Sequence, residues 1–278
     1  MPCAAMQRLD IRYDYFLSKT GSASAQIIVV HGLNTRPEVM DPLAKMLSSD
    51  GYDVFRLRLS RPIIGNGGNL ASLWVSELNS LYCELQNRNP NLPIYNLSFS
   101  LGSAVTLAFV KSHPNTTFKK KVFLAPAVTL HNYSLPFQLL APLLPGTVKL
   151  PSVAPVAYRE KSFTRIAEYH AVFLLTKYIR SGSTGRYRSG EVLVLQNPSD
   201  ELVSWKKLKR WLISENLDWQ LYELSERGDE NLPKHIIIDE QSLGAAGWNT
   251  ITDQIREFYR SGSNNVGLIL GEQPSALQ

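Results

Sequence analysis

The sequence predicts an α/β fold: a mostly parallel central sheet with helices on both faces and a small cap inserted between late strands. Two features of the chain predict it. Short apolar runs alternate with helix-like segments, and this order is typical of parallel strands joined by crossover helices. The runs are apolar at nearly every position rather than at every second one, which indicates strands covered on both faces.

The elements follow one another in a regular order. The expected strands are residues 27–30, 52–57, 94–97, 122–125, 192–196 and 220–224. The expected helices are residues 37–49, 69–86, 101–112, 203–216 and 245–260. Gly51 follows the first helix and Asn89-Pro90 follows the second, and both are helix-ending signals. We expect residues 1–260 to form one α/β domain and residues 261–278 a weakly ordered tail.

One interval, residues 131–190, is too long for a plain crossover between two strands. We expect it to form a cap over the C-terminal edge of the sheet, where ligands bind in such folds. Its first part is rich in proline and in large apolar side chains, which could form either an apolar wall of the binding site or the packing core of the cap itself. These side chains are Leu135, Phe137, Leu139, Leu140, Leu143 and Leu144.

A third interpretation of the cap, as a lid that touches lipid, is less favoured. Prolines interrupt its leucines, and no basic amphipathic helix adjoins them. Contact with a membrane through the cap therefore stays the weaker alternative.

The composition is typical of a globular enzyme, with 44% apolar and 19% charged residues in 278. The formal net charge of +5 is mild. Its basic clusters lie at residues 119–121 and 206–210. The second lies on a helix-like segment and is interpreted as a solvated helix face, since no interleaved pattern of aromatic and basic side chains indicates a nucleic-acid surface.

Cys3 and Cys83 are the only cysteines, so we expect neither a disulfide framework nor a zinc site built from cysteine. Residues 1–16 lack the apolar core of a signal peptide, and no apolar run approaches the length of a membrane span. These observations favour a cytoplasmic location.

Residues 93–113 carry the strongest functional signal. An apolar run meets a tight turn of small residues, Ser98 to Gly102, and a helix-like segment follows at once. This is the setting of a nucleophile elbow, in which a serine on a strained turn exposes its hydroxyl. Ser98 stands where the G-x-S-x-G pattern has its first glycine, and Ser100 is the predicted nucleophile.

A serine hydroxyl needs a base, and the base needs a carboxylate to orient it. Position along the chain sets four of the five histidines aside: His31 in a turn, His113 behind the elbow helix, His131 at the start of the cap and His170 inside it. His235 follows the last strand and a loop, from which it could reach Ser100. His235 is therefore the predicted base.

The carboxylate is expected in the loop after the strand at 192–196. Asp200 is preferred, Glu201 is the local alternative, and a helix N-cap is the competing role for Asp200. Asp229 and Asp239 adjoin His235 in sequence and would crowd it.

Acyl transfer also needs N–H donors for the developing oxyanion. The backbone N–H of Leu101, directly after the nucleophile, is one candidate. The second should come from the turn after the first central strand, where Gly32 lets the chain bend. Leu33 is the preferred donor and Asn34 the next.

These segments together resemble the α/β-hydrolase superfamily, in its group of serine carboxylesterases, monoacylglycerol lipases and serine aminopeptidases. The resemblance spans about residues 26–260 and includes IIVVHGLNTRP, GYDVFRLRLS, the helix with Trp74, the elbow, LQNPSDELV and KHIIIDEQS. It implies hydrolysis of carboxylic esters, less often of thioesters or amides, without metal or organic cofactor.

The chain departs from this group at two positions. Phe99 precedes the nucleophile, where histidine is frequent, and Ser60-Arg61-Pro62 replaces the usual Gly-His after the second central strand. Both changes should reshape the pocket without removing the catalytic chemistry.

The sequence thus predicts a serine esterase acting on small-molecule esters with small to medium acyl groups. The alternatives are a thioesterase or peptidase that uses the same residues, or a hydrolase-like protein that binds a ligand without turnover. Residues expected to contact the substrate are Asn34, Phe99, Leu135, Phe137 and Leu140.

Overall fold

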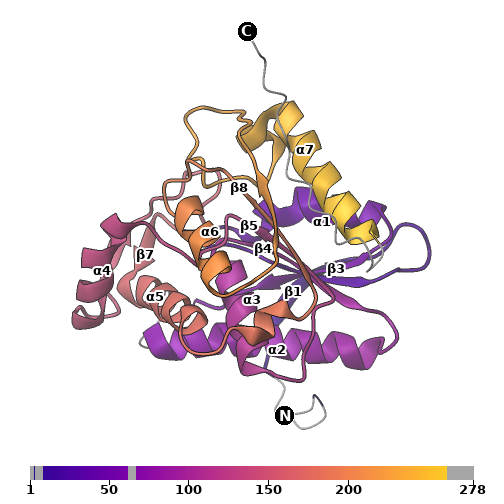
Figure 1. Cartoon of the computed structure of the whole chain (residues 1–278), viewed down its shortest axis with the longest axis horizontal. Helices are drawn as coiled ribbons and strands as arrows, with labels where there is room; N and C mark the ends of the chain where they lie inside the picture. The colour runs from indigo at the N-terminus through magenta and orange to yellow at the C-terminus, as the bar shows by residue number, and fades with distance from the viewer. Residues whose placement is uncertain (1–2, 4–8, 62–66, 262–278) are drawn as a thin grey trace.

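A seven-stranded sheet with the order β1-β3-β2-β4-β5-β8-β9 forms the centre of the molecule (Figure 1). The structure is a computed structural model that describes residue 3, residues 9–61 and residues 67–261. β1 pairs antiparallel with β3, and every other pairing in this sheet is parallel. The strands are β1 (Arg12–Phe16), β2 (Gln26–Val30), β3 (Asp53–Arg58), β4 (Ile94–Phe99), β5 (Lys120–Leu124), β8 (Glu191–Gln196) and β9 (Gln220–Glu223).

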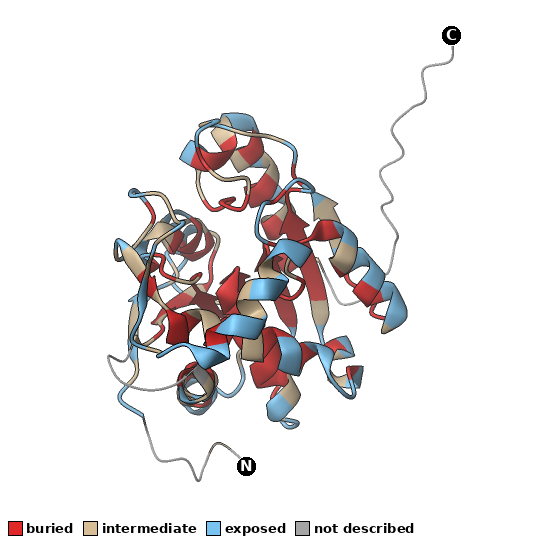
Figure 2. Cartoon of the chain, turned by 90° about the vertical axis from the view of Figure 1, so that its left-hand side faces the viewer, coloured by how far each residue is buried: buried red, intermediate tan, exposed pale blue. Residues whose placement is uncertain are grey.

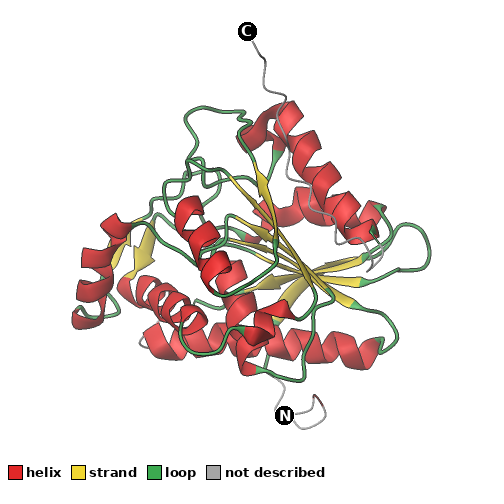
Figure 3. Cartoon of the chain, in the orientation of Figure 1, coloured by secondary structure: helices red, strands yellow, loops and turns green. Residues whose placement is uncertain are grey.

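Helices cover both faces of this sheet, which confirms the predicted fold class (Figure 3). α1 (Asp41–Ser49) and α7 (Glu240–Arg260) lie on one face, and α2 (Gly67–Arg88) and α3 (Leu101–Ser112) lie on the other (Figure 1). α6 (Trp205–Ser214) connects β8 to β9. The inner strands are buried between these layers, while the outer sides of the helices face solvent (Figure 2).

The chain order places a switch point between β2 and β4. From β2 the chain moves outward to β3, and it then returns to the other side of β2 to form β4. Loops that leave the C-terminal ends of such neighbouring strands diverge and open a crevice. The turn after β2 and the elbow after β4 therefore flank the same crevice.

Two elements differ from the prediction. β1 was not predicted, because this edge strand is only half buried and reads RYDYF, in which charged and aromatic residues alternate instead of forming a continuous apolar run. The helix expected from residue 245 is preceded by one more turn, since α7 runs from Glu240 with a break at Gly244, where φ is 70°. A positive φ interrupts a helix and is tolerated best by glycine.

The interval at 131–190 contains more structure than its sequence indicates. It holds η3 (Asn132–Ser134), α4 (Leu135–Leu140), η4 (Ala141–Leu143), the antiparallel pair β6 (Lys149–Pro151) and β7 (Phe163–Arg165), α5 (Ile166–Arg180) and η5 (Gly185–Arg188). α5 packs against α2 and α3 and so belongs to the helix layer of the sheet. α4 and β7 lie at the side of the molecule, beyond the sheet (Figure 1).

The two cysteines form one disulfide, Cys3–Cys83, which fastens residue 3 to α2. The sequence indicated no disulfide framework, and it did not reveal this bridge. Its partners are 80 residues apart, and a single pair at that distance carries no local pairing signal.

Two lysines of the first basic cluster, Lys120 and Lys121, are buried in β5. The Lys121 amine donates to the backbone carbonyl of Ser189, and burial lowers its pKa to about 7. The basic side chains Lys206, Lys209 and Arg210 on α6 are exposed, as expected. Within the described residues, no helix combines the length and the apolar character that crossing a bilayer requires.

Candidate active site

Ser100 occupies a strained turn between a strand and a helix. β4 ends at Phe99 and α3 begins at Leu101, so one residue makes the whole turn. Ser100 has φ 50° and ψ −112°, a conformation that is sparsely populated for residues other than glycine. Its N–H donates to the carbonyl of Leu124 at 2.9 Å, which ties the turn to the end of β5.

Gly102 explains why the helix can start so close to the sheet. A Cβ atom on Gly102 would lie 2.4 Å from the carbonyl oxygen of Val30 in β2. Backbone cannot yield as a flexible side chain can, so the close approach of α3 to β2 requires glycine at this position. This contact sets the first turn of α3, and with it Ser100, against the end of β2.

The structure brings Ser100, His235 and Asp200 into one hydrogen-bonded chain. Ser100 Oγ lies 2.8 Å from His235 Nε2, and His235 Nδ1 lies 2.7 Å from Asp200 Oδ2. All three residues are buried. They follow β4, β9 and β8 respectively, so the C-terminal edge of the parallel sheet gathers them although the chain separates them by up to 135 residues.

The second carboxylate oxygen of Asp200 fixes the side chain. Asp200 Oδ1 accepts from the N–H groups of Leu202 at 2.7 Å and Val203 at 3.0 Å. The N-cap of α6 is Ser204, whose hydroxyl accepts from Lys207 N–H. The competing N-cap role for Asp200 is therefore wrong, and its Oδ2 is left to face the imidazole.

Glu201 contacts the backbone of the histidine loop rather than the imidazole ring. Its carboxylate accepts from the N–H groups of Lys234 at 3.1 Å and His235 at 3.2 Å. The two neighbouring acids thus hold the same histidine in different ways. Asp200 contacts its ring, and Glu201 holds its main chain.

His131 contacts this site by a route that the sequence did not reveal. Its Nε2 lies 2.9 Å from the backbone carbonyl oxygen of Asp200, to which it donates. Its ring stacks on Tyr133, with the centroids 5.3 Å apart. His131 therefore joins the start of the cap to the loop that carries Asp200.

His31 is a buried structural histidine at the end of β2. The Leu59 N–H donates to its Nε2 at 3.1 Å, so the ring proton sits on Nδ1, which donates to the Gly32 carbonyl at 2.8 Å. Burial lowers the pKa of His31 from 6.5 to about 4. The neutral ring therefore links the ends of β2 and β3, in agreement with its interpretation as a turn residue.

Acid is expected to destabilise the protein partly through His31. Its folded-state pKa is about 4 against 6.5 for an ordinary histidine, so between these values only the unfolded chain binds the proton. The contribution to stability is complete above pH 6.5 and is lost as the pH falls toward 4. At about 1.4 kcal/mol per pKa unit, the loss is at most roughly 3.5 kcal/mol.

Urea unfolding at neutral pH and near pH 4.5 measures this effect. His31→Gln, whose side chain cannot take up the proton, should lose about 2 kcal/mol less stability between the two conditions than the wild type. His170→Gln, a change of the partly exposed histidine in α5, is the control and should behave as the wild type. Equal losses in wild type and His31→Gln would contradict the assignment.

The two candidate oxyanion donors, Leu33 and Leu101, lie beside Ser100. Both residues line the cavity next to the serine. Within the described residues, neither N–H donates to an acceptor of the protein. A buried N–H without a partner costs free energy, so these two amides are suited to receive a ligand oxygen.

The cavity at Ser100 has a volume of about 200 Å³ and is mainly apolar. No Asp, Glu, Lys or Arg side chain is among the described residues that line it. The cap contributes a cluster of four aromatic rings, Tyr133, Phe137, Tyr169 and Phe173. Phe137 packs edge to face on Tyr169 and Phe173, at centroid distances of 5.1 and 5.5 Å.

Of the predicted substrate contacts, Asn34, Phe99 and Phe137 line the cavity, and Leu135 and Leu140 do not. Leu135 is 48% exposed and Leu140 is 55% exposed. α4 turns Phe137 toward α5, and Leu135, two positions earlier, therefore lies about 200° around the helix. Leu140 is the last residue of α4, and the prediction failed because the direction of so short a helix depends on distant contacts.

The site contains no arrangement of metal ligands. Within the described residues, no group of three or more His, Cys, Asp or Glu side chains is placed to hold a metal ion. The polar side chains at the centre of the site are the hydroxyl of Ser100 and the imidazole of His235. These groups suit acyl transfer.

Solved structures of several hydrolases share this fold. A soluble variant of monoglyceride lipase from Saccharomyces cerevisiae, in complex with a substrate analogue, has a TM-score of 0.69 at 13% identity, covering 89% of this chain and 90% of that one. The monoacylglycerol lipase of Paleococcus ferrophilus has a TM-score of 0.65 at 13% identity, covering 90% and 100%. Est1E from Butyrivibrio proteoclasticus with bound ferulic acid has a TM-score of 0.58 at 12% identity, covering 92% and 98%.

At these identities the likeness establishes the fold, which is that of the α/β-hydrolases. A comparison with curated proteins finds no match. The sequence itself matches the family described as serine aminopeptidase, S33, over residues 21–173, which is more than half of its length. The strand order, the turn that carries Ser100 and this match lead to one conclusion: the chain belongs to the serine aminopeptidase S33 family of α/β-hydrolases.

Proposed function

We propose that the protein is a serine esterase that cleaves carboxylic esters with small to medium, uncharged acyl groups through an acyl-enzyme on Ser100. The observation that carries the proposal is the buried chain of hydrogen bonds from Ser100 through His235 to Asp200, which opens on an apolar cavity. A hydroxyl, a base and an orienting carboxylate in this order are what nucleophilic acyl transfer requires.

The first half of the reaction forms the acyl-enzyme. Ser100 Oγ attacks the ester carbonyl while His235 Nε2 takes the hydroxyl proton, and Asp200 stabilises the resulting imidazolium. The negative charge on the carbonyl oxygen is met by the N–H groups of Leu33 and Leu101. When the tetrahedral intermediate collapses, the bond to the alcohol breaks and His235 returns the proton to the leaving oxygen.

The second half repeats these steps with water. His235 removes a proton from a water molecule, the hydroxide attacks the acyl carbon, and the same two amides stabilise the oxyanion. The intermediate then releases the carboxylic acid, and the proton passes from His235 back to Ser100. Every proton in the cycle is carried by His235.

The cavity favours esters over peptides, although the family is described as serine aminopeptidase. An aminopeptidase must bind the ammonium group of its substrate, and burying that charge without a partner is costly. No carboxylate is among the described residues that line the cavity. Its aliphatic and aromatic walls suit neutral acyl groups, such as those of the esters that the structurally similar monoglyceride lipases act on.

Labelling and a matched substrate panel test the proposal. Intact mass after incubation with a fluorophosphonate should show a single adduct on the wild type. Turnover should then be compared among p-nitrophenyl esters of graded acyl length, the corresponding thioesters and an aminoacyl p-nitroanilide. We expect the esters to have the highest kcat/KM.

Two results would contradict this function. A folded protein without any adduct would indicate a ligand-binding protein that uses the fold without turnover. An adduct together with faster cleavage of the anilide than of the esters would indicate a peptidase, and faster cleavage of the thioesters would indicate a thioesterase.

A further inference from the structure

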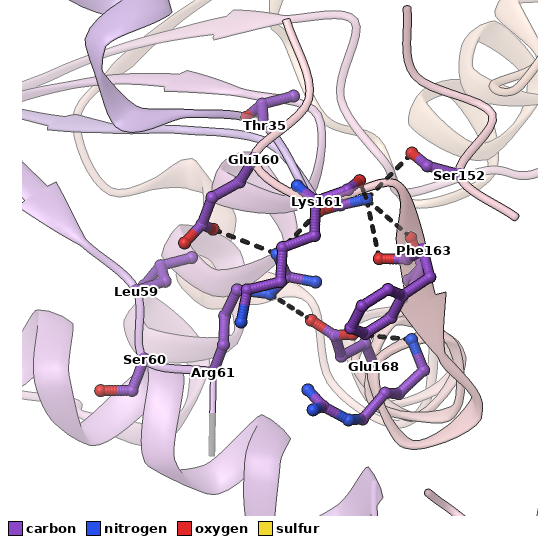
Figure 4. A network of polar contacts seen from close by, with 12 residues as sticks. Thr35, Leu59, Ser60, Arg61, Ser152, Glu160, Lys161, Phe163 and Glu168 are labelled. Atoms are coloured by element: carbon purple, nitrogen blue, oxygen red, sulfur yellow. Dashed lines mark hydrogen bonds and ion pairs between the residues drawn. The ribbon is translucent and has the colours of Figure 1, made fainter. Parts of the chain in front are cut away.

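The side chain of Asn34 joins the turn after β2 to the cap. Asn34 follows Leu33 and has φ 51°, a conformation that is uncommon for residues other than glycine. Its side chain is buried, and its amide group is hydrogen-bonded to the protein although the residue lines the cavity. The two N–H donors of its Nδ2 share four acceptors of the cap that lie within hydrogen-bond distance: Ser152 Oγ at 2.9 Å, Lys161 O at 2.9 Å, Phe163 O at 3.2 Å and Thr164 Oγ1 at 3.0 Å (Figure 4).

Arg61 binds the other end of the same amide. Its Nη1 donates to Asn34 Oδ1 at 2.7 Å, and its Nε donates to Glu168 Oε1 at 2.6 Å (Figure 4). A guanidinium can only donate, so Asn34 must turn its oxygen toward Arg61 and its NH₂ group toward the cap. The Lys161 N–H donates to the same Oδ1 at 3.1 Å, so Arg61 and the cap backbone together set the orientation of the Asn34 amide.

The contact between Arg61 and Glu168 is buried, so its geometry is fixed. The Arg61 side chain is 9% exposed, and that of Glu168 is 3% exposed. The second oxygen of Glu168 accepts from the Arg165 N–H at 2.7 Å, at the start of α5. A buried ion pair adds little net stability by itself, but its fixed geometry can hold other groups in place.

Backbone contacts continue the same connection. The Glu160 N–H donates to the Asn34 carbonyl at 3.0 Å, and the Arg36 N–H donates to the Tyr158 carbonyl at 2.9 Å. Thr35 forms an isolated bridge with Arg159. The turn that contains Leu33 is thus held on its C-terminal side by the cap.

We propose that Arg61 is a positioning residue for the reaction: by holding Asn34 against the cap, it keeps the Leu33 N–H where the oxyanion forms. This inference rests on the proposed function, because it requires the Leu33 N–H to act in catalysis. An oxyanion donor must lie about 2.7–3.1 Å from the charged oxygen. Leu33 directly precedes Asn34, so any rotation of Asn34 out of its φ of 51° moves the peptide plane next to that donor.

The same contacts assign a role to the departure from the family pattern at Ser60-Arg61. Arg61 reaches from the segment after β3 to the turn after β2 and to α5. The turn after β2, which contains Leu33, and residues 152–168 consequently form one connected unit, with Arg61 between them.

The experiment compares conservative variants of two ion-paired arginines, Arg61 after β3 and Arg56 within it. Arg61→Lys keeps the charge beside Glu168, but a single ammonium cannot reproduce the fork that reaches both Asn34 and Glu168. Arg56→Lys is the matched control. Arg56 is also buried and is ion-paired, with Asp14 and Asp41, and it does not line the cavity.

Each variant is measured for Tm, for kcat and KM on a p-nitrophenyl ester, and for Ki of a trifluoromethyl ketone, whose adduct carries an oxyanion. Arg61→Lys should lower kcat by about 10-fold or more, with KM within about threefold of the wild type. The Ki should rise as kcat/KM falls, because the inhibitor needs the same N–H donors. Arg56→Lys should change Tm and leave kcat and Ki as in the wild type.

A double variant separates positioning from stability. Arg61→Met combined with Glu168→Gln leaves no unpaired buried charge and keeps an acceptor for the Arg165 N–H. We expect its Tm to be close to that of the wild type and its kcat to stay low.

Three results would overturn the inference while leaving the proposed function intact. They are wild-type kcat and Ki in Arg61→Lys, recovery of kcat in the double variant, and equal losses of kcat in Arg61→Lys and Arg56→Lys. A wild-type protein that forms no fluorophosphonate adduct and cleaves no ester would remove the proposed function itself.

Discussion

Ser100→Ala is expected to abolish ester turnover and to leave the protein folded. In a serine hydrolase, removal of the nucleophile lowers kcat by a factor on the order of 10⁶. The stability effect should be small, because the Ser100 hydroxyl makes one side-chain hydrogen bond, to His235. Loss of one such bond is worth about 1 kcal/mol, or roughly 2–4 °C in Tm for a protein of this size.

The measurement pairs turnover with fluorophosphonate labelling and thermal unfolding. Ser100→Ala should show no adduct and a Tm near that of the wild type. Its turnover should exceed the uncatalysed rate of ester hydrolysis only slightly. Ser98→Ala, a change of the buried serine two positions earlier, is the control for the elbow. Ser98 Oγ contacts Asn96 and Thr106, so the Ser98→Ala variant should still be labelled fully by the fluorophosphonate. If Ser98→Ala were unlabelled and Ser100→Ala labelled, Ser98 would be the nucleophile.

Asp200→Asn is expected to lower kcat by about 10⁴, while Glu201→Gln should lower it by less than about 10-fold. The carboxylate of Asp200 accepts from His235 Nδ1, and an asparagine can turn an NH₂ group there and favour the wrong tautomer of the ring. Glu201 accepts from the backbone N–H groups of Lys234 and His235. The carbonyl oxygen of glutamine can keep one of these bonds.

Steady-state kinetics of the two amide variants, made at neighbouring positions with the same chemical change, provide the comparison. Circular dichroism confirms that each variant is folded. If Asp200→Asn were active and Glu201→Gln inactive, the orienting acid would be Glu201, and the loop would have to rearrange during the reaction.

The sheet and the three residues of the hydrogen-bonded chain could be singled out from the sequence because their signals are local. The inner strands are short apolar runs, and Ser100 and Asp200 each follow such a run, while His235 follows the edge strand β9 and a loop. In a parallel sheet the C-terminal ends of the strands share one edge. Position along the chain therefore carries most of the information about which side chains meet.

The cap could not be predicted in the same way, because distant contacts orient it. Arg61 was recognised as a departure from the family pattern, but its partner Glu168 lies 107 residues further along the chain. The orientation of α4, which turns Leu135 and Leu140 outward, depends on the packing of Phe137 on α5. The Cys3–Cys83 bridge spans 80 residues and has no local signal either.

The backbone of Ser100 has a consequence for how this position can vary. A non-glycine residue at φ 50° and ψ −112° costs on the order of 1–3 kcal/mol, and the surrounding fold must supply it in every molecule. Selection for stability alone would favour glycine at position 100, whereas chemistry requires a hydroxyl. Stability and activity thus favour different residues at this position, and the serine is retained only as long as turnover is useful.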